Sequence, residues 1–339
     1  MPKKILLTGG AGFIGSHTFI ALVNAGYVPV IFDNFCNSNP KVLHRLQQIT
    51  GVIPEHIDGD VRDAGALDAA FAQHAITAVL HFAGLKAVGE SVDKPLDYYD
   101  NNVNGTLVLL ASMRRANVTT LVFSSSATVY GDPAFTPIRE DFPLSATNPY
   151  GRSKLMVEEI LGDLHKAEPH WNIARLRYFN PAGAHESGLI GEDPQGIPNN
   201  LMPYLAQVAV GRRDRLRVFG GDYPTADGTG VRDFIHVMDL AEGHVAALQY
   251  FDHAGGLLTV NLGTGHGVSV LQMIDAFAVA SGKSIPHEIA ARRPGDIAEC
   301  WADPALAQHM LGWSAKRSLA EMTRDGWRWQ SGNPTGYAP

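Results

Sequence analysis

Short apolar runs alternate with longer amphipathic segments through the first half of the chain. The runs have the length and composition of strands, and the segments between them follow the period of helices. The apolar runs lie at 5–7, 28–33, 56–61, 78–84, 121–126 and 173–180. Strands that alternate with helices predict an α/β fold with a doubly wound parallel sheet of the Rossmann type. The ligands of such a sheet lie at the carboxyl ends of its strands.

The pattern changes after residue 180. A run rich in glycine and proline covers 181–203, a strand is predicted at 232–237, a helix follows at 238–250, and the chain from 269 onward is predicted to be helical. We therefore expect a first domain and a smaller, discontinuous C-terminal lobe. The first domain is predicted to contain residues 1–180 with a returning segment at about 231–262, and the smaller lobe residues 181–230 and 263–339.

Composition and charge narrow the classes of function. The chain has 339 residues, of which 18% are charged and 45% hydrophobic, and its formal net charge is −7. Nucleic-acid-binding proteins usually carry a basic surface, so that class is not expected. No apolar run approaches the length of a membrane span and no signal-peptide pattern is present, so we expect a cytoplasmic protein without membrane contact. The two cysteines, Cys36 and Cys300, lack metal-ligand spacing, and no metal site is expected.

The turn after the first predicted strand carries Gly9, Gly12 and Gly15. Glycines at this spacing let the backbone turn tightly and approach a pyrophosphate, and the N-terminus of the following helix favours an anion. Asp33 ends the next strand, where a carboxylate accepts hydrogen bonds from the adenosine ribose hydroxyls and repels a 2′-phosphate. No Arg or Lys follows in 34–38. The sequence therefore predicts NAD, not NADP, as the cofactor.

Tyr150 and Lys154 stand four residues apart at the start of a predicted helix. Asn148 is a good cap and Pro149 suits the first helical position, so Tyr150 lies in the first turn with Lys154 on the same face. A tyrosine with a pKa of about 10 is a poor base at neutral pH, but a nearby ammonium and the positive end of a helix favour the phenolate. The Tyr150–Lys154 spacing alone is a weak signal of a catalytic pair, and only the surrounding motifs support that interpretation.

The glycine loop, Ser126 at a strand end and the Tyr150–Lys154 pair together resemble the extended short-chain dehydrogenase/reductases. Four longer runs are similar to those of the UDP-glucose 4-epimerases in that family, namely 82–91, 98–106, 124–131 and 191–201. The resemblance covers essentially the whole chain. It is far more specific than any one of the motifs.

The resemblance implies a reversible epimerisation of UDP-galactose and UDP-glucose at carbon 4 through a transient 4-keto sugar. Tyr150 removes the proton of the 4-hydroxyl while NAD takes the hydride, and the flat keto sugar turns and takes the hydride back on its other face. Ser126 hydrogen-bonds the same sugar oxygen, and Lys154 also holds the nicotinamide ribose. The plainer alternatives are that Ser126 only caps the next segment and that Lys154 is a solvated helix charge.

The same resemblance implies a set of NAD contacts around the strand ends. Among them, Asp60 is placed to accept a hydrogen bond from the adenine amino group. The predicted cofactor residues are Gly9, Gly12, Phe13, Ile14, Gly15, Asp33, Asn34, Asn37, Ser38, Asp60, Val61, Phe82, Ala83, Gly84, Lys86, Asn101, Ser126, Tyr150, Lys154 and Phe179.

The smaller lobe is implied to bind the UDP-hexose. Two arginines on a diphosphate agree with the bidentate pairing of guanidinium and phosphate groups. The alternative for each arginine is a surface salt bridge, which is stronger for Arg217, where mainly backbone contacts to uracil are expected. The predicted substrate residues are Ser126, Tyr150, Asn180, Asn200, Leu201, Arg217, Phe219, Arg232, Arg293, Asp296 and Cys300.

Cys300 departs from the family pattern. The nearest bacterial relatives carry Tyr at this position, which in the family walls the pocket beside carbon 2 of the sugar. Smaller residues there accompany acceptance of N-acetylated sugars, so we hypothesise that UDP-N-acetylglucosamine and UDP-N-acetylgalactosamine are also substrates. The alternative is that Cys300 is a small buried apolar residue whose neighbours refill the space.

A nucleotide-sugar 4,6-dehydratase is the main enzymatic alternative. It begins with the same oxidation but then needs carboxylic acids to eliminate water. In that branch of the family an Asp–Glu pair follows the strand-end Thr, whereas Ser126-Ala127-Thr128 contains no acid.

A sensor or scaffold that binds NAD without chemistry is an alternative of a different class. Such proteins typically lose the Tyr or the Lys, whereas Tyr150, Lys154 and Ser126 are all present. A homodimer is also expected, because the helices around 98–116 and 149–166 would suit a four-helix dimer seam and the resemblance suggests the same.

Overall fold

A parallel sheet of seven strands forms the centre of the computed structural model, which describes residues 2–293 and 295–337. The strand order is β10-β6-β5-β4-β1-β2-β3, and it reverses beside β1, where the ligands of doubly wound sheets bind. The predicted fold class is therefore confirmed. The strands are β1 (Lys4–Thr8), β2 (Val28–Asp33), β3 (Glu55–Asp58), β4 (Ile76–His81), β5 (Thr120–Ser126), β6 (Asn172–Tyr178) and β10 (Leu257–Leu262).

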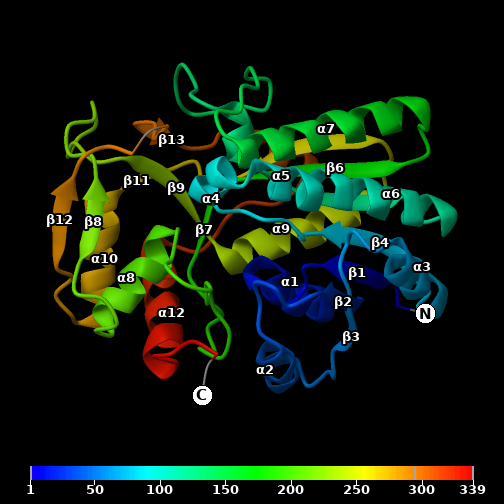
Figure 1. The fold of residues 1–339 in the computed structure, drawn as a ribbon, viewed down its shortest axis with the longest axis horizontal. Helices are drawn as coiled ribbons and strands as arrows, with labels where there is room; N and C mark the ends of the chain where they lie inside the picture. The colour runs from blue at the N-terminus through cyan, green and yellow to red at the C-terminus, as the bar shows by residue number, and fades with distance from the viewer. Residues whose placement is uncertain (1, 294, 338–339) are drawn as a thin grey trace.

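Helices cover both faces of this sheet (Figure 1). Alternate residues of β1 show why: Ile5 and Leu7 are buried in a cluster with Phe19, whereas Leu6 is buried on the other side with Leu109. One face carries α1 (Phe13–Asn24), α2 (Lys41–Thr50), α9 (Val237–Tyr250) and α11 (Ala305–Leu311). The other carries α3 (Ala64–Gln73), α4 (Val88–Asp93), α5 (Pro95–Tyr98), the π-helical η1 (Tyr99–Asn104), α6 (Gly105–Arg115) and α7 (Pro149–Ala167).

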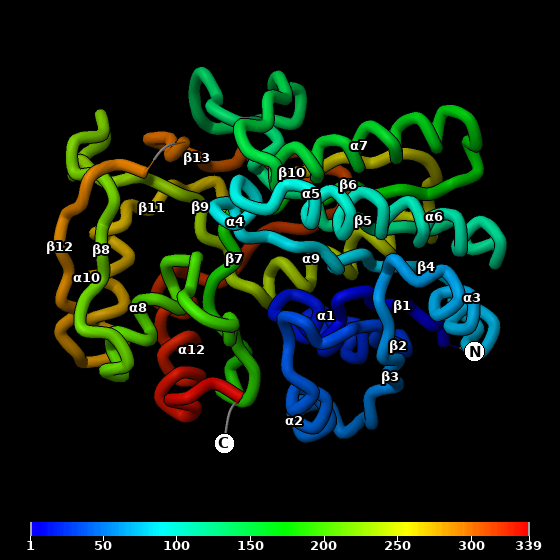
Figure 2. Tube along the Cα trace, viewed as in Figure 1, coloured from blue at the N-terminus to red at the C-terminus, as the bar shows by residue number. Residues whose placement is uncertain are grey.

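A second, smaller group of elements lies beyond one end of the sheet (Figure 2). Its four-stranded sheet contains β7 (Asn180–Ala182), β9 (Val231–His236), β11 (Gly267–Ser269) and β13 (Glu299–Cys300), and a two-stranded sheet contains β8 (Leu216–Phe219) and β12 (His287–Ala290). Its helices are α8 (Leu201–Ala209), α10 (Val270–Ser281) and α12 (Leu319–Gly332), and a short 3₁₀ helix, η2 (Ala127–Tyr130), follows β5. Within the described residues, no helix is both long and apolar enough to cross a membrane.

The element boundaries differ from the predictions in several places. The run at 56–61 ends its strand at Asp58, so Asp60 lies in the turn after it, and the run at 173–180 is divided between β6 and β7. The part from 269 onward is not all helical, because β12 and β13 form within it. β10 extends the large sheet, whereas β9 pairs with β7 in the smaller one. The division into domains at the boundaries given above stays a prediction.

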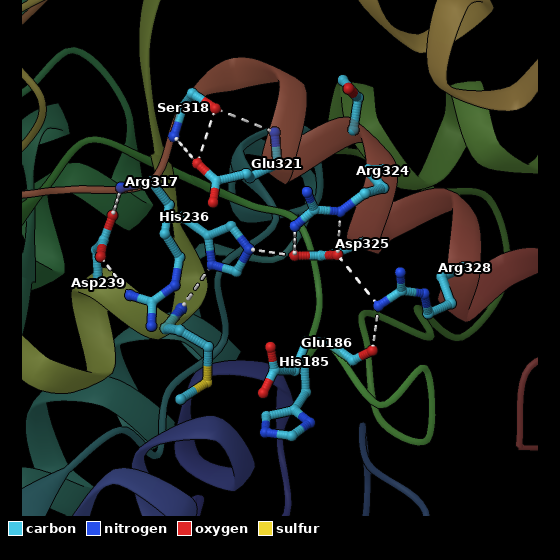
Figure 3. A network of polar contacts seen from close by, with 12 residues as sticks. His185, Glu186, His236, Asp239, Arg317, Ser318, Glu321, Arg324, Asp325 and Arg328 are labelled. Atoms are coloured by element: carbon cyan, nitrogen blue, oxygen red, sulfur yellow. Dashed lines mark hydrogen bonds and ion pairs between the residues drawn. The ribbon is translucent and has the colours of Figure 1, made fainter.

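A polar network joins α12 to the start of α9 (Figure 3). His236 caps α9 by accepting a hydrogen bond from the Met238 amide at 3.0 Å, and its Nε2 lies 3.4 Å from Asp325 Oδ2. Both side chains are almost fully buried, and Arg324 bonds to Asp325 at 3.0 Å from the solvent side. The network therefore fixes the last helix against the strand–helix junction that leads back to the large sheet.

Candidate active site

A cavity of about 490 Å³ opens at the carboxyl ends of β1, β2, β4, β5 and β6 and is closed on its other side by residues of the smaller lobe. Its volume is in the range of small-molecule and cofactor sites. Polar residues from both lobes converge on it. Among the described residues, no group of three His, Cys, Asp or Glu side chains could hold a metal ion.

The glycine loop forms one wall of the cavity with no room for side chains. Gly9 has φ +69°, and a Cβ atom on it would lie 2.7 Å from the Ala83 amide nitrogen. A Cβ on Gly15 would lie 2.5 Å from the Gly9 carbonyl oxygen. Gly12 is the N-terminal cap of α1, whose first amides face the cavity. This backbone surface fits a pyrophosphate, which the positive end of the helix also favours.

Asp33 lies at the end of β2, where it is buried and also organises the loop. Its Oδ2 accepts from the Ala11 amide at 2.9 Å, and its Oδ1 accepts from the Phe35 amide at 2.9 Å and from Ser38 Oγ at 3.0 Å. The carboxylate therefore joins β2 to the glycine loop. Ser38 and its neighbour Asn37 also line the cavity.

The catalytic candidates Ser126, Tyr150 and Lys154 all line this cavity. Asn148 caps α7 by accepting from the Gly151 amide at 2.9 Å, as predicted, and so places Tyr150 in the first turn. Ser126 caps η2, and its Oγ accepts from the Thr128 amide at 3.2 Å. Burial raises the pKa of Tyr150, and a hydrogen bond with Ser126 and the charge of Lys86 oppose this rise without cancelling it. The chain by itself therefore does not lower the pKa of Tyr150 as the sequence argument expected.

Lys154 is almost completely buried behind Tyr150. Its Nζ donates to the Ser124 carbonyl at 2.8 Å and lies 4.9 Å from the centroid of the Phe123 ring. No carboxylate among the described residues forms an ion pair with it, and burial lowers its pKa from 10.5 to about 8. Lys154 is therefore not a solvated helix charge.

A buried ion pair holds α7 against the strands that carry the site. Glu158 of α7 pairs with Arg177 of β6 at 2.6 Å and accepts from Ser125 Oγ of β5 at 2.5 Å. Arg177 Nη1 also donates to Tyr130 Oη at 2.9 Å. These contacts fix α7 relative to the end of β5, which carries Ser126.

The substrate candidates form the opposite wall. Arg293 is paired with Asp296 at 2.8 Å, whereas Arg232 bonds to the Val231 carbonyl at 2.8 Å and forms no ion pair with a described residue. Burial raises the pKa of Cys300 to about 11, so its thiol is neutral at physiological pH. The predicted substrate residues that line the cavity are Ser126, Tyr150, Asn180, Asn200, Arg232, Arg293, Asp296 and Cys300.

Most of the predicted cofactor residues also line the cavity. They are Gly9, Gly12, Phe13, Ile14, Gly15, Asp33, Asn34, Asn37, Ser38, Val61, Phe82, Ala83, Gly84, Lys86, Asn101, Ser126, Tyr150, Lys154 and Phe179. Asp60 does not line it, and Arg62 binds the Asp60 carboxylate at 2.7 Å and holds its pKa well below its ordinary value.

Three predicted substrate residues lie outside the cavity lining. Leu201 follows the cap of α8 and packs into the core of the smaller lobe. Arg217 is exposed, and its Nε lies 3.8 Å from Glu288. Phe219 is near the site, because the Arg293 guanidinium lies 4.8 Å from the centroid of its ring. The Arg217 side chain thus lies in a surface salt bridge, which was the alternative considered for it.

The cavity lining also contains residues that were not predicted as site residues, and three of them carry polar side chains that bear on the site. Tyr178 ends β6, and Thr128 donates from Oγ1 to Ser126 Oγ at 3.0 Å. Glu192 binds Lys86 Nζ at 2.9 Å across the cavity mouth. The sequence offered a signal for Glu192, because it lies in the run 191–201 that carries the family resemblance. No neighbouring residue in the sequence indicated Lys86 as its partner.

Comparisons with known proteins find relatives over nearly the whole chain. Residues 6–326 match the family model described as GDP-mannose 4,6 dehydratase. A UDP-glucose 4-epimerase of Bacillus subtilis is 60% identical over 333 residues, which are 98% of each chain. The structure of a Bifidobacterium longum UDP-glucose 4-epimerase in complex with NAD+ and UDP is 55% identical, with a TM-score of 0.96 over 99% of this chain and 100% of that one. The Stenotrophomonas maltophila enzyme, with bound NAD and formylated UDP-arabinopyranose, has a TM-score of 0.96 at 51% identity over 97% of this chain and 98% of its own.

Proposed function

Because this chain belongs to the UDP-glucose 4-epimerase family, we infer that it interconverts UDP-galactose and UDP-glucose at carbon 4 with NAD as its cofactor. One observation carries the assignment. Tyr150, Lys154 and Ser126 meet in a single cavity that has the glycine loop on one side and Arg232 and Arg293 on the other. The chain is therefore an isomerase that acts on a nucleotide sugar.

Tyr150 is the proposed proton acceptor for the 4-hydroxyl of the sugar. Ser126, whose hydroxyl lowers the pKa of Tyr150, would donate to the same sugar oxygen as charge develops on it. The Lys154 ammonium lies one turn along α7 and favours the phenolate form of Tyr150. NAD, held by the glycine loop and Asp33, supplies the hydride acceptor and donor at carbon 4. Tyr150 then returns the proton after the keto sugar has turned.

The turn of the sugar requires that the rest of the substrate stay bound. Arg232 and Arg293 are suited to hold the diphosphate, since a guanidinium pairs with phosphate through two parallel hydrogen bonds. Arg232 has no carboxylate partner among the described residues, so its charge is available to an anion. We therefore assign the fixed anchor to these arginines and the moving part to the hexose.

A 4,6-dehydratase is not favoured, although the matching family model carries that description. Elimination of water needs a carboxylic acid beside the sugar. Among the described residues, the acids that line the cavity are all engaged elsewhere. Asp33 bonds the glycine loop, Glu192 bonds Lys86, Asp193 accepts from the Tyr337 amide at 2.8 Å, and Asp296 pairs with Arg293.

Product analysis by NMR tests the proposed function. The protein is incubated with UDP-galactose and no added NAD, and UDP-glucose is expected to appear until equilibrium is reached, because the reaction regenerates its cofactor. Tyr150→Phe is the matched control, since it removes the hydroxyl and leaves the ring. No conversion by the parent protein even after NAD is supplied would refute the assignment, and equal conversion by Tyr150→Phe would refute the role of the base.

We also propose that Cys300 leaves room for an N-acetyl group at carbon 2. Cys300 lines the cavity and packs beside Phe179 and Ala302 in a buried cluster. Replacing it by Tyr would fill that space. Cys300→Tyr is expected to lose turnover of UDP-N-acetylgalactosamine and keep turnover of UDP-galactose, and unchanged turnover of both would contradict the proposal.

We propose a homodimer formed by the helices beside the active-site helix. Exposed apolar side chains lie on consecutive helices of this face, which α5, α6 and α7 occupy together in Figure 1: Leu96 on α5, Leu107 on α6 and Met156 on α7. A patch of this kind favours burial against a second copy. Light scattering is expected to give a dimer for the parent protein and a monomer for Leu107→Lys, and a monomeric parent would exclude this interface.

We place the protein in the cytoplasm, where thiols remain reduced. Cys36 and Cys300 are both free and form no disulfide. Cell fractionation tests this location, and recovery of the protein outside the cytoplasmic fraction would overturn it.

A further inference from the structure

Glu192 joins two parts of the cavity mouth that belong to different lobes. Its Oε1 accepts from Lys86 Nζ at 2.9 Å and from Asn200 Nδ2 at 2.7 Å. Lys86 follows β4 of the large sheet, and Asn200 precedes α8 of the smaller lobe. All three residues line the cavity, and the Glu192 side chain is only 9% exposed, against 46% for Lys86. The carboxylate is therefore the buried partner of a cation at the rim of the site.

The backbone around Glu192 is held from behind. A Cβ atom on Gly191 would lie 2.3 Å from the Trp329 ring, so only glycine permits this close approach. Trp329 Nε1 donates to the Glu192 carbonyl at 3.4 Å, and the next residue, Asp193, accepts from the Tyr337 amide at 2.8 Å. The segment is thus fixed to α12 and the residues after it, while the Glu192 side chain reaches forward to Lys86.

Lys86 is the ammonium group whose charge acts on Tyr150, although Lys154 also lines the cavity. Lys154 is buried on α7 without a carboxylate partner among the described residues, whereas Lys86 is paired with Glu192. The positive charge of Lys86 lowers the pKa of Tyr150. Tyr98 and Tyr178 also face Tyr150, and since burial raises the pKa of each, they are neutral there.

We propose that Glu192 is a positioning residue of the epimerase site. It clamps Lys86 and Asn200 across the cavity mouth. By neutralising the charge of Lys86, it also limits how strongly that ammonium favours the Tyr150 phenolate. The effect of Glu192 on catalysis rests on the proposed function. The clamp itself rests on the geometry of the three side chains. Removing the negative charge while keeping the shape should leave Lys86 uncompensated and make Tyr150 more acidic.

The test uses Glu192→Gln, which keeps the length of the side chain and an oxygen for Lys86. Glu186→Gln is the matched control, since Glu186 is an exposed acid of the same loop that does not line the cavity, and it binds Arg328 through its backbone carbonyl, not its carboxylate (Figure 3). The cofactor-loaded proteins are titrated spectroscopically for tyrosinate, each against its own Tyr150→Phe version. The pH–rate profile of UDP-galactose turnover is measured in parallel, and thermal denaturation verifies that each variant is folded.

In Glu192→Gln, the Tyr150 midpoint and the acidic limb of the rate profile are expected to move to lower pH. In Lys86→Met, both should move to higher pH, and adding Glu192→Gln to that variant should cause no further shift, because Glu192 acts through Lys86. Glu186→Gln should titrate as the parent does. An unmoved Tyr150 midpoint in folded Glu192→Gln would overturn the inference and leave Glu192 as a structural bridge. A shifted midpoint without any turnover by the parent would uphold the clamp and refute the proposed function.

Discussion

Replacement of Lys154 by Met is expected to abolish epimerisation and yet stabilise the fold. Lys154 is 6% exposed, and burial alone accounts for the fall of its pKa from 10.5 to about 8. Met has a similar length and no charge to desolvate. The variant therefore separates the function of the ammonium from its effect on the free energy of unfolding.

The effect of the Lys154 ammonium on the free energy of unfolding depends on pH, and its sign and size follow from the folded and unfolded pKa values. A lysine with a depressed pKa contributes stability that is fully present above its unfolded value of 10.5 and is lost as the pH falls through about 8. At about 1.36 kcal/mol per pH unit, the buried ammonium lowers the free energy of unfolding by about 3 kcal/mol at pH 7 and by about 1.4 kcal/mol at pH 9.5. The advantage of Lys154→Met over the parent should thus shrink by about 2 kcal/mol between these two pH values.

Urea denaturation of both proteins at the two pH values measures this difference, with one NAD concentration throughout so that the difference in NAD affinity between variant and parent enters alike at both pH values. Met cannot donate to the Ser124 carbonyl, and the loss of that hydrogen bond subtracts about 1–3 kcal/mol at both pH values alike. The change between the two pH values is therefore the decisive quantity. If the difference between variant and parent were the same at both, Lys154 would not be a desolvated ammonium and the argument would be refuted.

Three further predictions concern the groups that support the site. Glu158→Ala leaves Arg177 charged and unpaired in the core, so urea denaturation should show a loss of about 3–5 kcal/mol, and a loss below about 1 kcal/mol would contradict it. Asp33→Asn removes the charge that repels a 2′-phosphate, so binding measurements should show a smaller preference for NAD over NADP, and an unchanged ratio would count against Asp33 as the selector. Burial raises the pKa of Asp325, but hydrogen bonds from His236 and Arg324 outweigh it and lower the pKa, so the stability gained there is present above the ordinary value of 3.8 and lost at lower pH. Asp325→Asn should therefore lose less stability than the parent between about pH 6 and pH 3, and equal losses would contradict this.

Features with a local signal could be predicted from the sequence. The strands of the large sheet are short apolar runs, the glycine loop is a contiguous motif, and Asn148 lies next to the helix that it caps. Each depends on residues within a few positions of one another, where periodicity and capping rules apply. These signals were sufficient to predict the fold class and the edge of the sheet where the cavity lies.

The rest depends on contacts between distant residues. The smaller sheet is built from strands as short as Glu299–Cys300, which is too short to show a period. The Lys86–Glu192 pair joins residues 106 positions apart, and neither has a local partner that would reveal it. The assignment of Asp60 to adenine stays a prediction, and the ion pair of its carboxylate with Arg62, two residues on, was not predicted from the sequence.

The position of β10 has a consequence for how the chain folds as it is synthesised. β10 pairs in parallel with β6 at the edge of the large sheet, yet it is translated roughly 80 residues later. At 5–20 residues per second, the edge of β6 has no partner for about 4–16 s while the intervening segment emerges from the ribosome. Unpaired strand edges invite association with other chains, and charged side chains on them discourage it. Arg175 on β6 supplies such a charge, and its Nε donates to Thr259 Oγ1 of β10 at 2.8 Å in the finished sheet, so this guanidinium is placed to protect the nascent edge from aggregation.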